Sequence, residues 1–235
     1  MPTADPDVAG GWAFLQVPYD DLVMARIVTK VSPFKRPVHG EKTYAQRPAY
    51  TNALDTVEKR FLENVVAVAF EHGAKHYPGM AAYENIDLSF VFGPPGTACQ
   101  QWHMDSRDPL KPVVSATLIV AGAEDACPTE FADIKYVASN VEDDQIAAVA
   151  LAMKLPMDWK TLVPAKVLDS HRGPHVLRIF HGDAIHRAPA NPLGALERVC
   201  LFLSWGPPGA TTERVTFEQH YNIMRVGTHI HIHTY

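Results

Sequence analysis

The chain contains little cysteine and no long apolar run, and both absences limit what it can be. Its three cysteines are widely spaced, at Cys99, Cys127 and Cys200. An odd, scattered set predicts no disulfide framework and no Cys-x-x-Cys metal site, and it favours reduced thiols in a reducing compartment. No stretch approaches the ~20 apolar residues of a membrane-spanning helix. The acidic start, residues 1–7, lacks the apolar segment of a signal peptide. We therefore expect a soluble, cytoplasmic protein with no membrane partner.

A sustained basic stripe is also missing. The formal net charge is −5 at pH 7, whereas a dedicated duplex-binding protein usually carries clustered positive charge. Nucleic acid is therefore an unexpected partner. Apolar residues make up 47% of the 235 residues, which predicts a single domain, 1–235, with a sizeable core. The composition does not indicate an oligomeric state.

Two segments show helical spacing. In residues 55–76, apolar side chains recur at intervals of three and four, which predicts a helix that packs against a sheet. The apolar face expected there consists of Val57, Phe61, Val65, Val68 and Ala69. Residues 140–154 form a second helix candidate, inside an insertion at about 123–175. Residues 17–31 are expected to form a strand and then a short helix, and residues 32–48 a polar loop.

The remaining patterns favour strands. Alternating or short apolar runs predict strands at 83–92, 98–105, 113–121, 129–131, 176–181, 198–205 and 228–234. With strands in the middle and at the end of the chain, and helices mainly early, the sequence predicts a mainly β fold with flanking helices. The architecture that fits this order is a double-stranded β-helix, the cupin-like jelly roll.

Two potential metal ligands lie two residues apart, at His103 and Asp105. Residues i and i+2 of a strand share one face, so both side chains can point into one pocket. His186, which follows a predicted turn, can complete a set of two histidines and one carboxylate. Such a set covers one face of a metal and leaves the other positions open, which suits non-haem Fe(II) and O2 chemistry. The alternative is a hydrogen-bonded His–Asp pair at a strand end.

His181 competes with His186 for the third ligand position. It belongs to a second His-x-Asp, and about one such triplet is expected from composition by chance, so neither triplet is informative in isolation. We favour His186 and expect His181 to pack in its strand or to orient a ligand. A local site formed by His181, Asp183 and His186 would leave His103 and Asp105 unexplained.

Arg198 lies 12 residues beyond His186 and opens an apolar run. A guanidinium can bind a carboxylate through two parallel hydrogen bonds. Strand alternation places four residues on one face: Arg198, Cys200, Phe202 and Ser204. If that face lines a barrel, the charge of Arg198 needs an anion. Candidate hydroxyl donors to the same anion are Ser204, Thr117 and Ser115.

Taken in order, His103-x-Asp105, His186 and Arg198 resemble the Fe(II)/2-oxoglutarate-dependent dioxygenases. The context from Gly182 to Arg198 looks most like the phytanoyl-CoA-hydroxylase and prolyl-hydroxylase-like branches, and the resemblance spans residues 83 to 206. It implies a double-stranded β-helix in which His103, Asp105 and His186 bind Fe(II) and Arg198 holds 2-oxoglutarate. It also implies that O2 and 2-oxoglutarate are co-substrates. A substrate C–H bond would be hydroxylated or otherwise oxidised as 2-oxoglutarate is decarboxylated to succinate.

Three alternatives stay open: a cupin-type metal enzyme without 2-oxoglutarate, a non-catalytic jelly-roll module that binds a ligand or partner, and a nucleic-acid oxidase or demethylase of the same superfamily. The weakly negative charge favours a small molecule or an amino-acid or peptide substrate. Two other histidine sets carry ordinary interpretations. The pair His72 and His76 has no third ligand nearby, and His229, His231 and His233 fit a terminal edge strand.

Overall fold

A computed structural model describes residues 12–16, 20–37, 44–46, 52–100, 103–105, 113–122, 129–131, 175–182, 186–212 and 215–216. The second helix candidate, most of the expected insertion and the terminal strand with its three histidines lie outside the described residues.

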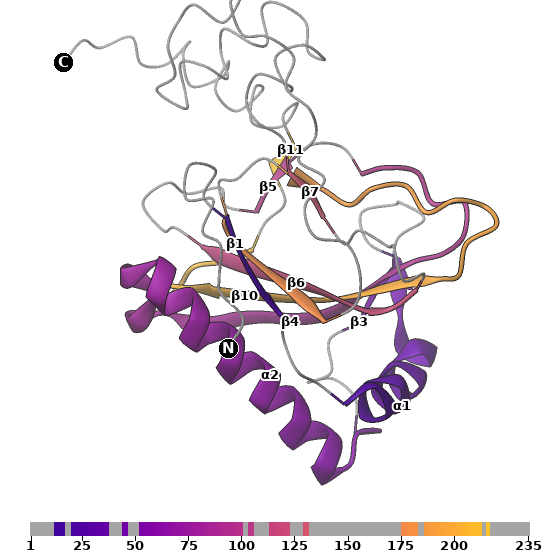
Figure 1. The fold of residues 1–235 in the computed structure, drawn as a ribbon, viewed down its shortest axis with the longest axis horizontal. Helices are drawn as coiled ribbons and strands as arrows, with labels where there is room; N and C mark the ends of the chain where they lie inside the picture. Colours follow the sequence, from indigo (N-terminus) through magenta and orange to yellow (C-terminus); the bar gives the residue numbers. More distant parts are fainter. Residues whose placement is uncertain are drawn as a thin grey trace, which may run out of the picture.

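Two antiparallel sheets form the body of the described structure (Figure 1). Within the described residues, the larger sheet has seven strands in the order β1-β8-β6-β10-β4-β3-β2, and the smaller has four in the order β11-β5-β9-β7. The larger sheet contains β1 (Trp12–Gln16), β2 (Arg36–Pro37), β3 (Tyr44–Gln46), β4 (Glu84–Gly93), β6 (Val114–Ala121), β8 (Val176–His181) and β10 (Arg198–Gly206). The smaller sheet contains β5 (His103–Met104), β7 (Glu130–Phe131), β9 (His186–Arg187) and β11 (Val215–Thr216).

From β4 to β11 the chain passes from one sheet to the other at every step. Even-numbered strands from β4 to β10 belong to the larger sheet, and the odd-numbered strands from β5 to β11 belong to the smaller one. This alternation is the winding of a double-stranded β-helix, so the predicted architecture is what the strand order shows. The inner face of the larger sheet consequently looks towards the smaller sheet.

Two helices cover the outer face of the larger sheet, α1 (Asp21–Val31) and α2 (Thr56–His76) (Figure 1). Short 3-10 helices follow them, η2 (Ser32–Phe34) and η4 (Pro78–Ala82). Asp55 begins α2 with a capping box, because its carboxylate accepts the Glu58 N–H and the Glu58 carboxylate accepts the Asp55 N–H. The helix expected at 55–76 is therefore confirmed to within one residue.

The buried face of α2 differs from the expected one. Val57 and Val68 are 62% and 41% exposed, so the prediction that they face the sheet is wrong. The residues that α2 buries are Glu58, Leu62, Val65, Ala69 and Gly73. The carboxylate of Glu58 accepts a hydrogen bond from Lys30 of α1 at 2.8 Å, so the buried face of α2 includes a residue that contacts α1. The spacing of apolar residues does not predict a buried carboxylate whose partner lies on another helix.

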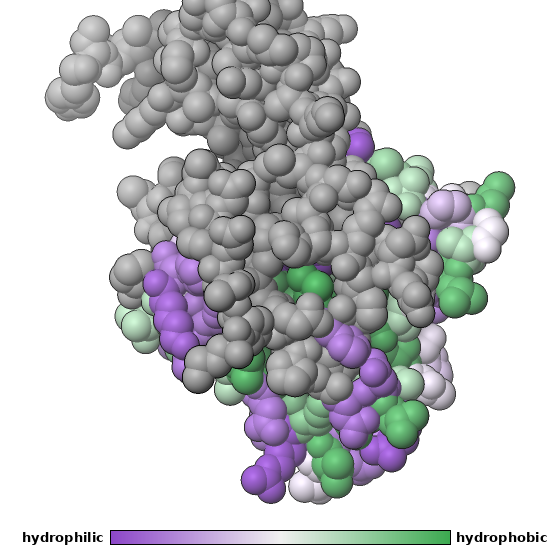
Figure 2. Space-filling view, viewed as in Figure 1, coloured by the Kyte–Doolittle hydropathy of each residue, from purple (hydrophilic) through white to green (hydrophobic). Residues whose placement is uncertain are grey.

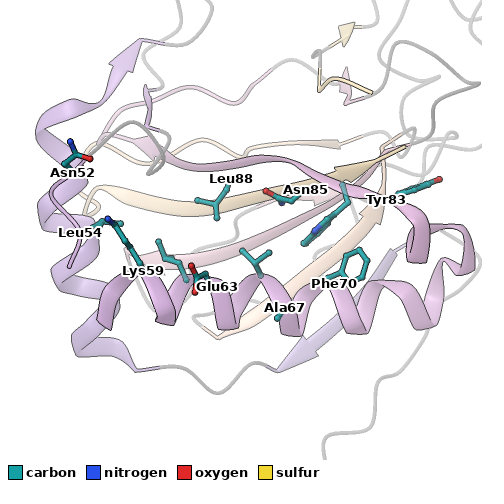
Figure 3. Close-up of a pocket in the computed structure, with 12 residues that line it drawn as sticks. Asn52, Leu54, Lys59, Glu63, Ala67, Phe70, Tyr83, Asn85 and Leu88 are labelled. Carbon is teal, nitrogen blue, oxygen red and sulfur yellow. The ribbon is translucent and has the colours of Figure 1, made fainter. Parts of the chain in front are cut away.

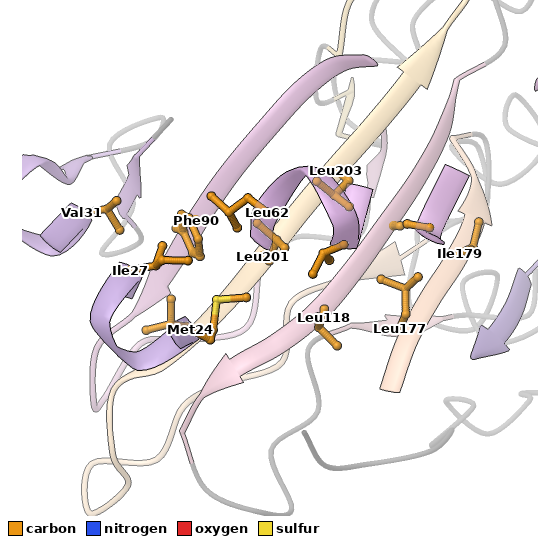
Figure 4. Packing of buried hydrophobic residues seen from close by; sticks show 14 of the residues in the cluster. Met24, Ile27, Val31, Leu62, Phe90, Leu118, Leu177, Ile179, Leu201 and Leu203 are labelled. Carbon is orange, nitrogen blue, oxygen red and sulfur yellow. The ribbon is translucent and has the colours of Figure 1, made fainter. Parts of the chain in front are cut away.

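The main hydrophobic core lies between these helices and the outer face of the larger sheet (Figure 4). Alternate residues of each strand contribute to it, as the pleat requires. On β10 these residues are Val199, Leu201, Leu203 and Trp205. The expected strand alternation is confirmed here, since Arg198, Cys200, Phe202 and Ser204 occupy the opposite face. That face lines the barrel interior.

Several boundaries differ from expectation. The first strand, β1, ends before residue 17, and the helix after it takes up Asp21–Val31. Two short strands, β2 and β3, occur in the segment expected as a loop, and β3 pairs with β4. In this way the segment covers an otherwise open strand of the sheet. The strand expected at 98–105 is reduced to β5, and β9 was not expected. Two-residue strands are too short to show a period.

In the described part of the chain, no helix is both long enough and apolar enough to cross a bilayer. The surface over α1 and α2 mixes hydrophilic and hydrophobic side chains (Figure 2). Such mixing is ordinary for the outer face of helices that pack on a sheet.

Candidate metal centre and barrel interior

Asp105 and His186 come together at the smaller sheet. The backbone of His103 in β5 pairs with His186 in β9, and Asp105 follows β5 directly. His186 Nε2 lies 3.4 Å from Asp105 Oδ1, and the two side chains are 6% and 8% exposed. Two ligand atoms at right angles around a cation, each about 2.1 Å from it, lie about 3 Å apart. The two side chains are therefore spaced as two ligands of one metal ion can be.

The side chain of His103 lies outside the described part of the structure. Among the side chains that are described, no third histidine, cysteine or carboxylate joins Asp105 and His186 in a metal-binding group. The assignment of all three residues as metal ligands stays a prediction.

The Asp105 carboxylate is oriented by its neighbours. Ser115 Oγ donates to Asp105 Oδ2 at 2.8 Å, and the backbone N–H of Asp105 donates to the Gly182 carbonyl at 2.7 Å. The imidazole of His186 packs against the Phe180 ring with centroids 4.7 Å apart. One carboxylate oxygen is thus held by a hydroxyl, while the other faces the imidazole. Partners of this kind fix the orientation of metal-ligating side chains.

Cross-strand register arranges the inner face of the larger sheet in four rows. The first, here called the metal row because it contacts Asp105 and His186, consists of Asp87, Ser204, Ser115 and Phe180. The second row consists of Ser89, Phe202, Thr117 and Arg178. The third row contains Val91, Cys200 and Ile119, and the fourth contains Gly93 and Arg198. Successive rows are about 7 Å apart, because each is two residues further along its strand.

Ser204 and Arg198 lie in the first and the fourth of these rows, at opposite ends of the inner face. Ser204 Oγ lies 2.9 Å from Ser115 Oγ, in the metal row. Arg198 lies six residues away on the same strand, about 20 Å along it. Its Nη2 donates to the Pro189 carbonyl at 2.7 Å, and its guanidinium lies over Gly93. Of the predicted co-substrate residues, Ser204 is thus near Asp105 and Arg198 is in the fourth row.

Thr117, the remaining predicted hydroxyl, occupies the second row with a second arginine. Thr117 Oγ1 lies 3.0 Å from Thr129 Oγ1, and Arg178 is its direct cross-strand partner. Arg178 is fully buried, at 0% exposure, and its Nη1 donates to the Val176 carbonyl at 3.2 Å. The apolar run at 176–181 predicts a buried strand but no functional residue within it. The missed signal is one charged residue inside an otherwise apolar run.

The structure separates His181 from the Asp105–His186 pair. His181 pairs with Val114, whose side chain belongs to the core on the helical side of the sheet. The His181 ring lies 6.1 Å from the Tyr77 ring. His181 therefore faces the outer side, whereas His186 faces Asp105.

On α2, the rings of His72 and His76 are 4.8 Å apart, and burial lowers the pKa of His72.

A groove of about 620 Å³ lies on the outer side of the larger sheet, between α2 and the strands β4 and β10 (Figure 3). Its floor is apolar, and Lys59 and Glu63 of α2 are among the polar residues that line it. Trp205 and Leu88 line it from the sheet. Because the sheet stands between this groove and the barrel interior, the groove is separate from Asp105 and His186.

Comparison with known proteins shows the fold. No protein-family model and no curated protein matches the sequence. A crystal structure of SnoK, a non-haem alpha ketoglutarate dependent carbocyclase from nogalamycin biosynthesis, is 13% identical with a TM-score of 0.57, covering 91% of this chain and 89% of SnoK. A Pseudomonas putida prolyl-4-hydroxylase is 16% identical with a TM-score of 0.51, covering 86% and 95%. HygX from Streptomyces hygroscopicus, with nickel and 2-oxoglutarate bound, is 8% identical with a TM-score of 0.51, covering 86% and 85%. At these identities the likeness shows a shared fold, and it confirms the double-stranded β-helix.

Proposed function

We propose that this chain is an Fe(II)- and 2-oxoglutarate-dependent dioxygenase. In this proposal it oxidises a C–H bond of a small molecule or an amino-acid side chain, with O2 as co-substrate and 2-oxoglutarate decarboxylated to succinate. One observation carries the proposal: the buried Asp105–His186 pair, 3.4 Å apart, inside a double-stranded β-helix and next to the backbone pairing of His103 with His186. HygX, which has been crystallised with nickel and 2-oxoglutarate bound, supports a metal ion and 2-oxoglutarate as the molecules that this fold binds here.

The donor atoms fit Fe(II). Imidazole nitrogens from His103 and His186 and a carboxylate oxygen from Asp105 make up the facial set that suits this metal. Bound there, Fe(II) would supply the oxidising chemistry together with O2 and 2-oxoglutarate. The chain would hold the ligands in place and exclude water. The side-chain exposures of 6% and 8% at His186 and Asp105, and the hydroxyl of Ser115 on Asp105 Oδ2, support those two roles.

A dicarboxylate co-substrate also needs a positive charge at its far end. Two buried arginines, Arg178 and Arg198, lie on the inner face of the larger sheet, and a guanidinium binds a carboxylate through two parallel hydrogen bonds. The binding of 2-oxoglutarate by Arg198 stays a prediction. Ser204 would contribute a hydroxyl at the metal row, and Thr117 one at the second row.

The substrate class is inferred from the same fold in other proteins. HygX has been crystallised with hygromycin B bound, and a Trichoplax adhaerens prolyl hydroxylase with a hypoxia-inducible-factor peptide fragment. These complexes support a small molecule or an amino-acid side chain as substrate. The net charge of −5 does not favour nucleic acid.

The test is an anaerobic titration of the purified chain, first with Fe(II) and then with 2-oxoglutarate. We expect a weak visible charge-transfer band in the wild type and its loss in His186→Ala. The matched control is His181→Ala, which should keep the band because that side chain faces the outer side of the sheet. A flat spectrum from folded wild-type protein would overturn the proposal and leave a non-catalytic jelly-roll module. Succinate release with candidate substrates comes next.

A further inference from the structure

We propose that the groove on the outer side of the larger sheet binds a free amino acid with an apolar side chain, and that Lys59 and Glu63 hold its two charged groups. The groove lies between α2 and the strands β4 and β10 (Figure 3). The sheet separates it from Asp105 and His186, so this inference concerns a second site and does not depend on the proposed function.

The size and lining of the groove suit a small organic molecule. Its volume of about 620 Å³ falls within the range of about 300–1,000 Å³ that is usual for ligand sites. Apolar side chains come from both of its walls, and they include Leu62, Val66, Ala67 and Phe70 of α2 and Leu88 and Trp205 of the sheet. An apolar lining with a few polar groups is typical of a site that encloses the apolar part of a ligand and orients its polar end.

Two charged side chains of α2 line the same groove one helical turn apart. Lys59 and Glu63 are both exposed, and residues at i and i+4 of a helix have Cβ atoms about 5–6 Å apart. Within the described residues, neither side chain makes a hydrogen bond or an ion pair. The order of the charges agrees with this, because a glutamate four residues before a lysine pairs better than the reverse. Glu71 and Lys75 of the same helix have the favoured order and pair at 2.9 Å.

An ammonium and a carboxylate at this spacing are complementary to a zwitterion. The carboxylate of an amino acid can accept hydrogen bonds from Lys59, while its ammonium donates to Glu63. A ligand with a single charge would be attracted by one of these side chains and repelled by the other. The pair therefore selects a molecule that carries both charges, and an α-amino acid carries them on one carbon atom.

The residues beyond this pair determine which side chain the amino acid carries. Val66 and Ala67 lie three and four residues after Glu63, so the apolar floor begins about 5 Å further along the helix. Phe70 follows one turn later, and its ring centroid lies 6.1 Å from that of Trp205 at a tilt of 56°. An apolar side chain attached to the zwitterion can lie along this floor, and an aromatic ring gains further from tilted contacts with other rings. We therefore expect phenylalanine, or an amino acid of similar size, as the ligand.

The experiment titrates four ligands into the full chain and measures each dissociation constant from the shifts of the amide NMR signals. L-Phenylalanine has both charges and the ring, 3-phenylpropionate lacks the ammonium, phenethylamine lacks the carboxylate, and glycine lacks the ring. We expect L-phenylalanine to bind about fivefold more tightly than either singly charged analogue, which corresponds to the upper end for an exposed ion pair. Glycine should bind most weakly of the four, because it buries no apolar side chain.

Substitutions assign each part of the ligand to its partner. Lys59→Gln should remove the preference for L-phenylalanine over phenethylamine, and Glu63→Gln should remove the preference over 3-phenylpropionate. Ala67→Phe fills the groove from an exposed position and should abolish binding of all three aromatic ligands. The matched controls are Glu71→Gln and Lys75→Gln, which change the same residue types on the same helix outside the groove and should keep both preferences.

Four outcomes would overturn the inference. They are the absence of saturable binding of L-phenylalanine, equal binding of L-phenylalanine and its singly charged analogues, preferences that survive in both Lys59→Gln and Glu63→Gln, and unchanged binding in folded Ala67→Phe. Circular dichroism verifies the folding of each variant. If Ala67→Phe does not fold, the two glutamine variants decide, because both replace exposed side chains.

Discussion

Replacing Ser115 with alanine tests whether Asp105 is a metal ligand that the barrel holds in place. Ser115 is fully buried and donates to Asp105 Oδ2 at 2.8 Å. A hydrogen bond to a charged group contributes about 1.5–3 kcal/mol. Loss of such a partner behind a metal ligand typically weakens metal binding by about 10–100-fold, which corresponds to about 1.4–2.7 kcal/mol. The two ranges agree, so we expect Ser115→Ala to weaken binding of Co(II) by about 10–100-fold.

The measurement is a calorimetric titration of Co(II) into the wild type and the variant, with circular dichroism to verify folding. Ser89→Ala is the matched control. Ser89 Oγ donates to Asp87 Oδ1 at 2.6 Å and is also buried, so it too removes a hydroxyl from a buried carboxylate of the same sheet face. We expect a similar loss of stability in both variants, but weaker Co(II) binding in Ser115→Ala alone. Unchanged Co(II) affinity in Ser115→Ala, or an equal loss of affinity in Ser89→Ala, would contradict the role of Asp105 as a metal ligand held by Ser115.

Three further predictions concern the scaffold. Glu58→Ala removes the capping partner of α2 and the acceptor for Lys30, and it should lower the free energy of unfolding in urea by about 1–2 kcal/mol through the cap. Gly206→Ala would put a methyl group 2.6 Å from Ala210 Cβ, so the end of β10 must shift and the Tm should fall, with a cost of about 1–3 kcal/mol. Burial lowers the pKa of His72 below its ordinary value of 6.5. Just below pH 6.5 the unfolded chain therefore binds more protons at this residue than the folded chain does. The free energy of unfolding, compared with that of His72→Gln, should decrease as pH falls through 6.5.

The two substitutions of Glu58 and Gly206 each have a control variant with the same change at another position, and the pKa of His72 has a direct measurement. Glu63→Ala, exposed on α2, should leave the free energy of unfolding almost unchanged. Gly194→Ala meets no atom within 4 Å and should leave the Tm near that of the wild type. For His72, NMR titration of the ring protons measures the pKa directly, and a value above 6.5 would contradict the expected burial effect.

Long strands could be predicted from the sequence, whereas the strands of the smaller sheet could not. β4, β6, β8 and β10 begin and end within about one residue of their predicted bounds, because each carries a period or an apolar run long enough to recognise. β9 has two residues and exists through its pairing with β5 and β7. No local pattern encodes such a strand, since the partners that stabilise it lie far away in the chain.

The residues of the candidate site could be predicted from the sequence, whereas their positions relative to one another could not. His103, Asp105, His186 and Arg198 could be selected from residue type, spacing and order. The row in which each inner-facing residue lies could not, because it depends on cross-strand register. Arg178 shows this most clearly, since its neighbours in the chain are apolar and its polar partner Thr117 comes from another strand.

Residue type and neighbours within one element are enough to identify potential ligands and long strands in this chain. Three features follow from the packing of distant strands instead: the 3.4 Å approach of Asp105 and His186, the outward orientation of His181, and the position of Ser204 and Arg198 at opposite ends of the barrel. Hydrogen bonding between strands far apart in the chain sets these separations, and a shift of one residue in that register would exchange the inner face for the outer one.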